Sequence, residues 1–282
     1  MKQHNIEKII DSTDNLPTLP SIYTKLTSLL EQSNSTVSMV ANVISEDQTI
    51  AAKVLKIVNS AFYGSPRKIG SLQRAVVILG LREIKSMVLA TSTLRMFGQL
   101  QSGHGLDMKS FWKHSIGCAI SAKVLAEAAY LKNPEDVFTG GLLHDIGKMI
   151  HAIYLPQEFS SVIADIKDSG MPLFESEKGI LGFTHAQTGG LLAEKWRFPE
   201  EVINMISEHH LDHESPNLTK EVAAVHIGNI LCIAFSLGSG GEKSVPIANQ
   251  KAWEVLCLRL GTLESLTGRI IKLFTEAISI LE

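Results

Sequence analysis

A histidine, a carboxylate and a lysine stand close together in one apolar stretch of the chain, residues 140–148. His144, Asp145 and Lys148 are surrounded there by leucine, isoleucine and glycine. A polar group that is buried without a partner costs roughly 2–7 kcal/mol. We therefore expect these three side chains either to pair with one another or to serve a ligand.

Further histidines lie on, or at the ends of, predicted helices that have an apolar face. The complete set of candidate metal ligands is His114, His144, Asp145, His185, His209 and His210. Imidazole and carboxylate groups together suit divalent transition metals such as iron, manganese, nickel or zinc. A single buried histidine is more often a hydrogen-bonded structural residue, so the metal hypothesis requires that these residues meet in space.

The elements that must position these residues are all predicted to be helices. Apolar residues recur with the helical period, and no convincing alternation typical of a strand is found. Ser110 is the expected N-cap of a helix over residues 111–130 that carries His114. Residues 222–237 are expected to form a buried helix, because this run is shorter than the ~20 residues of a membrane span.

Start signals place the other candidate residues on particular helices. Asn133–Asp136 combines a cap residue, a proline at the first helical position and two acids that favour the helix dipole. The helix that it opens is expected to carry both His144 and Asp145. The pattern Thr184–Gln187 fits a capping box, which places His185 at the start of a helix.

The bulk composition is typical of a globular protein. The 282 residues are 45% hydrophobic and 20% charged, and the net charge of −3 provides no field that would favour nucleic acid or an anionic membrane. We see no secretory signal in the polar start of the chain. The three cysteines form no CxxC pair and suit a reducing compartment. We therefore expect a cytoplasmic protein that does not contact a membrane.

A cluster of basic residues lies between Lys53 and Lys85, where seven basic residues accompany one acid, Glu83. Next to the joint at Gly80, this cluster could indicate a helix-turn-helix that contacts a phosphate backbone. The other interpretation is a solvated face or a docking surface for an acidic partner. We favour the latter and do not expect nucleic acid to be a partner.

The motifs also resemble a known family. The run Leu142–Lys148, with histidines before and after it, is similar to the HD superfamily of metal-dependent phosphohydrolases. Four N-terminal motifs resemble more narrowly the HDOD family, the HD-related output domain of bacterial signalling proteins. These motifs are Leu16–Pro20, Ile44–Asp47, Asn59–Gly64 and Ala75–Leu81. The resemblance covers about residues 14–237.

The resemblance implies an all-α, cytoplasmic bacterial protein that acts in signal transduction through protein partners in trans. Residues 1–109 would form the N-terminal helical subdomain of the HDOD module. Residues 110–237 would form the HD-like helical subdomain with the metal site. Residues 238–282 would form a C-terminal helical extension, which begins at the flexible break Gly238–Gly241.

The resemblance also assigns roles in the site. It places metal ligands on His114, His144 and Asp145, and the relatives that hold two metals add His185, His209 and His210. Lys148 falls on the position that touches a substrate phosphate. Asn229 stands where the catalytic pattern has an aspartate, so the site has one negative charge fewer and binds a divalent ion less tightly. The Gly-Tyr-Pro loop of the cyclic-dinucleotide phosphodiesterases is absent after His210.

Two functions follow from these observations. The first is a regulatory module that binds signalling proteins and keeps a metal site as a structural or ligand-sensing centre, with a nucleotide or phosphate as a candidate ligand. The alternative is an active metal-dependent phosphohydrolase that acts on a nucleotide or a cyclic dinucleotide. In that alternative, Asp145 and Lys148 would be the catalytic residues.

Overall fold

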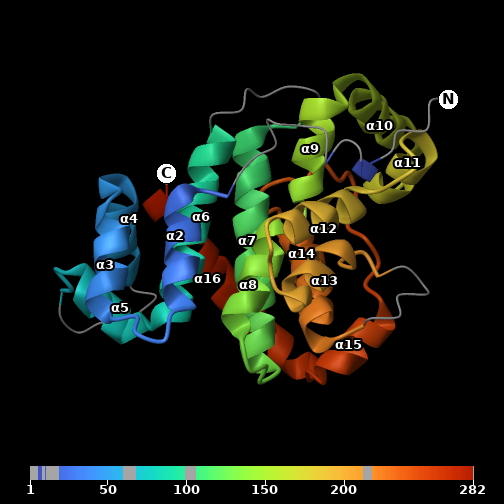
Figure 1. Ribbon diagram of the computed structural model, residues 1–282. Coiled ribbons are helices and arrows are strands. Elements are labelled where there is room, and N and C mark those ends of the chain that lie inside the picture. The colour runs from blue at the N-terminus through green and yellow to red at the C-terminus, as the bar shows by residue number, and fades with distance from the viewer. Residues whose placement is uncertain are drawn as a thin grey trace. The chain divides into compact units, whose positions relative to one another are not determined.

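The structure is a computed structural model that describes residues 6–7, 10, 19–59, 68–98, 106–211 and 218–281. The secondary-structure elements within these ranges are helices, and none of the residues described lies in a strand (Figure 1). The predicted all-α fold is thus confirmed. Residues 16–18 and 60–64 of two family-like motifs lie outside the described residues. The stretch 99–107, whose glycines and polar residues predict a boundary, lies outside them as far as residue 105.

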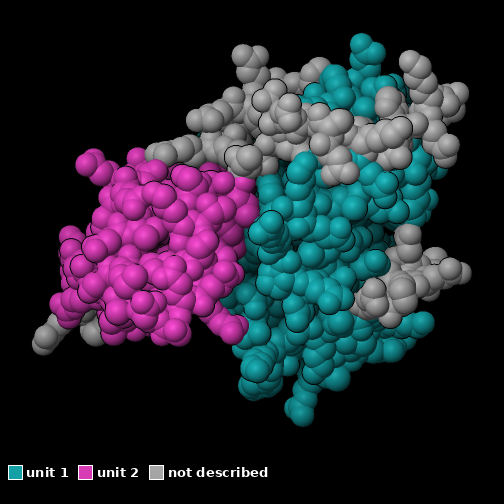
Figure 2. Space-filling view, viewed as in Figure 1, with its two compact units in different colours: residues 1–17, 100–270 teal, residues 18–99, 271–282 magenta. Residues whose placement is uncertain are grey.

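The chain forms two compact units, which Figure 2 colours separately. Unit 1 comprises residues 1–17 and 100–270, and unit 2 comprises residues 18–99 and 271–282. The predicted subdomain boundaries after residues 109 and 237 stay predictions. By its contacts, however, the stretch after residue 237 belongs to unit 1 as far as Ile270.

Unit 2 is built from short amphipathic helices that bury one face each and from one longer helix whose residues 86–93 are all buried. They are α2 (Ser21–Leu30), α3 (Val37–Ser45), α4 (Gln48–Val58), α5 (Leu72–Leu79) and α6 (Leu81–Gly98). Asp47 caps α4 by accepting hydrogen bonds from the backbone of Thr49 and Ile50 at 3.0 and 3.1 Å. Gly80 separates α5 from α6 with φ of 81°, a conformation that glycine adopts without strain.

Unit 1 contains all the candidate ligands. Its helices are α7 (Met108–Ala128), α8 (Pro134–Leu143), α9 (Ile146–Tyr154), α10 (Pro156–Ser169), α11 (Leu173–Ile180), α12 (His185–Lys195), α13 (Glu200–Ser207), α14 (Lys220–Ala234) and α15 (Gln250–Leu256). The last helix, α16 (Leu263–Leu281), begins in unit 1 and ends in unit 2. Within the ranges described, no helix is both long enough and apolar enough to cross a membrane.

Helix α7 is the centre of unit 1, because α8 and α14 both pack closely along it (Figure 1). Glycines permit this approach. A Cβ atom on Gly141 of α8 would lie 2.9 Å from the Cα atom of Ala119, and one on Gly228 of α14 would lie 2.8 Å from the backbone nitrogen of Ala122. This packing brings His114 of α7 next to the C-terminal ends of α8 and α14, at His144 and Cys232.

The predicted start of α7 is wrong by a few residues. Asp107, rather than Ser110, is the N-cap, and its carboxylate accepts hydrogen bonds from the backbone nitrogens of Lys109 and Ser110 at 3.2 and 3.3 Å. Aspartate caps helices as well as serine does. The predicted capping box of α12 is confirmed: Thr184 and Gln187 exchange hydrogen bonds of 3.2 and 2.9 Å.

Candidate metal centre

His144 and Asp145 lie in a sharp turn between two helices, and the prediction of one continuous helix through them is wrong. Helix α8 ends at Leu143 and α9 begins at Ile146. Beyond the turn, Gly147 packs against the start of α12, and a Cβ atom there would lie 2.0 Å from the backbone oxygen of His185. The turn allows α9 to meet the start of α12, and it directs both side chains into the interior of unit 1.

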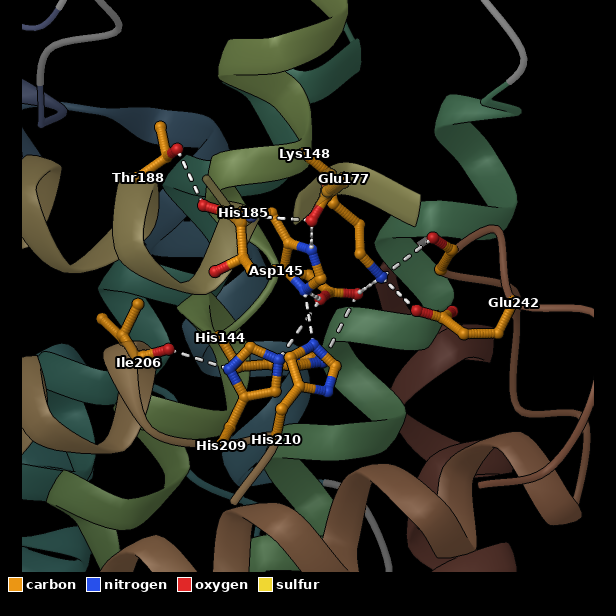
Figure 3. Close-up of polar contacts among 12 residues, drawn as sticks. His144, Asp145, Lys148, Glu177, His185, Thr188, Ile206, His209, His210 and Glu242 are labelled. Atoms are coloured by element: carbon orange, nitrogen blue, oxygen red, sulfur yellow. Dashed lines mark hydrogen bonds and ion pairs between the residues drawn. The ribbon is translucent and has the colours of Figure 1, made fainter. Parts of the chain in front are cut away.

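The carboxylate of Asp145 is the centre of the site, and histidines approach both of its oxygens (Figure 3). Its Oδ2 atom lies 3.4 Å from the Nε2 atoms of His114 and of His144. Its Oδ1 atom lies 3.2 Å from Nε2 of His185 and 3.8 Å from Nε2 of His209. One side chain thus links histidines from four separate segments of the chain.

The candidate ligands form two groups. The first group is His114, His144 and Asp145, and the second group is His185, His209 and His210. Within each group the potential ligand atoms all lie within 4.8 Å of one another. In the second group, the Nε2 atoms of His185 and His210 are 2.8 Å apart. The structure therefore brings together all six predicted ligands, and their binding of a metal stays a prediction.

The outer nitrogens of three of these rings are held by acceptors, which fixes how the rings are presented. Nδ1 of His144 lies 2.8 Å from the carbonyl oxygen of Gly141, and Nδ1 of His209 lies 2.8 Å from that of Ile206. Nδ1 of His185 lies 2.6 Å from a carboxylate oxygen of Glu177. A carbonyl can only accept, so Nδ1 of His144 and His209 carries the proton and Nε2 keeps its lone pair. This is the arrangement of histidines that bind metals.

Several atoms that face the centre are buried and have no hydrogen-bond partner. They include the Nε2 atoms of His114, His144 and His209 and the Oδ1 atom of Asp145. Buried polar atoms are almost always paired in proteins, so each exception needs an explanation. Divalent cations account for these atoms, because they accept the lone pairs of imidazole and carboxylate. The donor set therefore fits a metal.

For His144, His209, His210 and Asp145 the electrostatics favour the forms that bind a metal. Burial lowers the pKa of His144 to about 4 and also lowers the pKa values of His209 and His210, whose neighbouring imidazoles act in the same direction. Burial opposes ionisation of Asp145, yet His144 and Lys148 hold the pKa of that carboxyl well below its usual range. Neutral imidazoles and an ionised carboxylate are the species that coordinate cations. Burial acts to lower the pKa values of His114 and His185 as well, but the neighbouring Cys232 and Asp145 raise the pKa of His114 to about 10, and Glu177 raises that of His185.

Lys148 is completely buried and its amino group is fully engaged. Its Nζ atom donates to Oδ2 of Asp145 at 2.8 Å, to the backbone oxygen of Gly240 at 3.1 Å, and to the carboxylate of Glu242. These three acceptors use its three N–H groups. The role of Lys148 toward a substrate phosphate stays a prediction, and a phosphate would have to replace one of these acceptors.

Four residues of this network were missed in the sequence. Glu177 of α11 accepts hydrogen bonds from His185 and lies 3.0 Å from Nδ1 of His151, whose other nitrogen is 2.7 Å from the hydroxyl of Thr188. Although burial opposes it, these imidazoles lower the pKa of Glu177 to about 2. Glu242, which contacts Lys148, is the fourth missed residue after Glu177, His151 and Thr188. No local pattern marks these residues, since they reach the site only through tertiary packing.

A small cavity adjoins the second group. Its volume is about 160 Å³, and it is lined by Phe174, Lys178, Thr184, Ala186, Gln187, Ser207, Glu208, His210 and Leu211. The ring of His210 stacks on Phe174 with centroids 4.4 Å apart. The second group therefore has space beside it that a small ligand could enter.

Comparison with known proteins places this arrangement in a family. Residues 16–211 match the HDOD domain. A crystal structure of an HDOD domain protein with unknown function from Geobacter sulfurreducens has a TM-score of 0.83 and 27% identity, over 98% of this chain and 96% of that chain. A proposed phosphohydrolase from Shewanella amazonensis shares the fold, with a TM-score of 0.74 and 24% identity, over 98% of this chain and 96% of that chain.

A protein of Treponema pallidum, itself uncharacterized, is 27% identical over 240 residues, which is 84% of this chain. The match covers 46% of the length of that relative. The family match extends over well more than half of the sequence and over both compact units. The chain therefore belongs to the HDOD domain family.

Proposed function

We propose that this chain is a regulatory module of bacterial signal transduction, whose HD-like centre holds divalent transition-metal ions and which acts through protein partners in trans. The observation that carries the metal assignment is the set of buried ligand atoms without partners around Asp145. Membership of the HDOD family, which the sequence comparison shows, supports the signalling role.

Each group would hold one ion. His114 and His144 would bind the first together with Oδ2 of Asp145, and the second group would bind the other with Oδ1 of the same carboxylate. The mixture of imidazole and carboxylate favours iron, manganese, nickel or zinc. When bound, such an ion lowers the pKa of its water and polarises phosphoryl oxygens.

The surroundings of the first group support a regulatory role over hydrolysis. His114, His144, Asp145 and Lys148 are all completely buried. The amino group of Lys148 is already bound by three acceptors of this chain. The chain thus uses its own groups where a phosphohydrolase would bind a substrate phosphate.

One observation favours the alternative, a metal-dependent phosphohydrolase that acts on a nucleotide or cyclic dinucleotide. The cavity of about 160 Å³ beside His210 contains a cation, Lys178, and a stacked aromatic ring, Phe174. Such groups suit a phosphate and a base. Release of phosphate or of a linear product by metal-loaded protein from a panel of phosphodiesters, absent with Asp145→Ala, would establish this second function and displace the first.

The metal assignment is tested by elemental analysis of the purified protein after metal loading and removal of excess metal. We expect about two ions per chain for the unchanged protein, and fewer for His144→Ala and His185→Ala. Glu254→Gln, at an exposed position of α15, is the control and should bind as the unchanged protein does. Absence of metal from the unchanged protein would leave the site a buried polar network and contradict the proposal.

A further inference from the structure

The segment between α14 and α15 returns to the metal centre, although its glycines suggested a flexible break. The backbone nitrogen of Ser239 donates to the backbone oxygen of Ser110 at 3.0 Å. A Cβ atom on Gly238 would lie 2.2 Å from the backbone nitrogen of His114. Gly238 also has φ of 90°, which a residue with a side chain rarely adopts. Glycine is therefore required here to bring the backbone against α7.

Gly240 lies directly against the first group. A Cβ atom there would lie 2.7 Å from Oδ2 of Asp145 and 3.0 Å from Cδ2 of His114, the ring atom bonded to Nε2. It would also lie 2.7 Å from Oε2 of Glu242. The position of this Cβ atom is thus surrounded by atoms of two predicted ligands, Asp145 and His114, and of Glu242, which belongs to none of the sequence motifs.

The side chain of Glu242 is 9% exposed, and its two oxygens have different surroundings. Oε1 pairs with Nζ of Lys148, as Figure 3 shows. Oε2 is buried and has no hydrogen-bond partner. A buried carboxylate oxygen without a partner is costly, so this atom needs a cation or a donor. The Nε2 atom of His114, which lies on the same side of Gly240, also has no hydrogen-bond partner.

Charge balance gives a second reason to include Glu242. The cation Lys148 lies 2.8 Å from Oδ2 of Asp145, the oxygen that the first group offers to a metal. An uncompensated ammonium at that distance repels a divalent ion strongly in a buried site. Glu242 neutralises this ammonium. The amide of Asn229, buried and with its Oδ1 atom unpaired, cannot supply the negative charge.

We propose that Glu242 is the seventh residue of the metal centre, and that its carboxylate balances Lys148 and offers its free oxygen to the cation of the first group. The proposal rests on the proposed function, because it presupposes that the first group binds a metal. The preferred ligand is a divalent transition-metal ion at that group. The charge that Asn229 does not provide comes instead from the segment that follows α14.

The test is a titration of the metal-free full chain with Co²⁺, followed by its visible absorption and by calorimetry. Glu242→Gln keeps the size of the side chain and removes the charge. We expect the affinity of one ion per chain to fall by roughly 10- to 100-fold, the range seen when partners around a metal site are lost. The absorption of that ion should change, whereas the other ion should bind as before. Glu254→Gln is the matched control.

A double variant separates charge balance from a merely structural role. Lys148→Met together with Glu242→Gln removes both charges, so we expect it to recover much of the affinity that Glu242→Gln alone loses. If Glu242→Gln does not fold, Glu242→Asp is used. Its shorter carboxylate should weaken the same ion only, and unchanged affinity would contradict the proposal.

The outcomes distinguish the two proposals. If the unchanged protein binds no Co²⁺, the proposed function itself fails. If the unchanged protein binds two ions and Glu242→Gln binds both with the same affinity, the role of Glu242 is wrong and the metal centre stands. An equal loss of both ions in Glu242→Gln would also contradict a role confined to the first group.

Discussion

The two halves of the metal centre share one carboxylate but differ in their surroundings. The first group is completely buried, and the charges of Lys148 and Glu242 lie beside it. In the second group, His210 is partly exposed and borders a cavity of about 160 Å³. Under the proposed function, the first half would stabilise the fold around a metal, and the second half would be where a ligand or solvent approaches.

The histidines are also oriented differently. In the second group, the carboxylate of Glu177 holds His185, which strengthens an imidazole as a ligand. In the first group, the Nδ1 atom of His114 has the thiol of Cys232 3.4 Å away, which is a weaker partner. We therefore expect the metal affinity of the first group to depend on the charges of Lys148 and Glu242. We expect that of the second group to depend on the carboxylate of Glu177, which is hydrogen-bonded to His185.

The largest effect should come from Asp145→Asn, because this residue is common to both halves. The amide keeps the shape and removes the charge next to all four nearby histidines. We expect the affinity of both ions to fall by at least about 100-fold, the upper end of the effect of losing a residue around a metal. Calorimetric titration measures both sites together. Asp168→Asn, at an exposed position of α10, should change neither site.

Glu177→Gln should affect only the second half. The amide no longer offers His185 a charged acceptor, so the affinity of the second group should fall by roughly 10- to 100-fold while the first group keeps its ion. Glu175→Gln, on the exposed face of the same helix, is the control. If a Co²⁺ titration shows an equal loss of affinity for both ions, the prediction that Glu177 acts on the second group alone is wrong.

Gly240→Ala should affect the first half and the fold together. The added methyl group would lie 2.7 Å from Oδ2 of Asp145, so the segment must shift, with a loss of about 1–3 kcal/mol in unfolding free energy. Gly268→Ala in α16, where nothing lies within 4 Å, should instead gain about 0.5–1 kcal/mol. Urea denaturation compares them, and equal effects would mean that Gly240 is not closely packed in solution.

The metal-free protein should also show a pH dependence that comes from Glu177. Its pKa is about 2 in the folded protein, against 4.5 for an ordinary glutamate. The carboxylate therefore adds stability above pH 4.5, and this stability is lost as the pH falls toward 2. Below pH 4.5, the unfolding free energy should fall more steeply than in Glu177→Gln, by up to about 1.4 kcal/mol per pH unit. Parallel curves would contradict this linkage.

The sequence was sufficient for the fold class, since helices depend on local signals. The resemblance selected six candidate ligands that the structure brings close together, and their binding of a metal stays a prediction. The capping box at Thr184 places His185 correctly at a helix start because both of its hydrogen bonds lie within one turn. The end of α5 at Gly80 likewise follows from a local signal, the glycine itself. The turn between α8 and α9 could not be predicted, because it accompanies a tertiary contact, between Gly147 and His185.

The same distinction explains which site residues were missed. Glu177 and Glu242 carry no helix, capping or motif signal that marks them, and each reaches the centre from a segment far along the chain. Gly238–Gly241 was interpreted as a flexible break, because glycine in sequence indicates conformational freedom. In the structure, the lack of side chains at Gly238 and Gly240 serves close packing instead.

The most direct test of the two-part metal centre is a crystal structure of the metal-loaded protein with anomalous scattering data. We predict two anomalous peaks in each chain. One should lie among His114, His144 and Oδ2 of Asp145, and the other among the second group and Oδ1. No peak beside Asp145, or a single peak bound by histidines of only one group, would contradict the account.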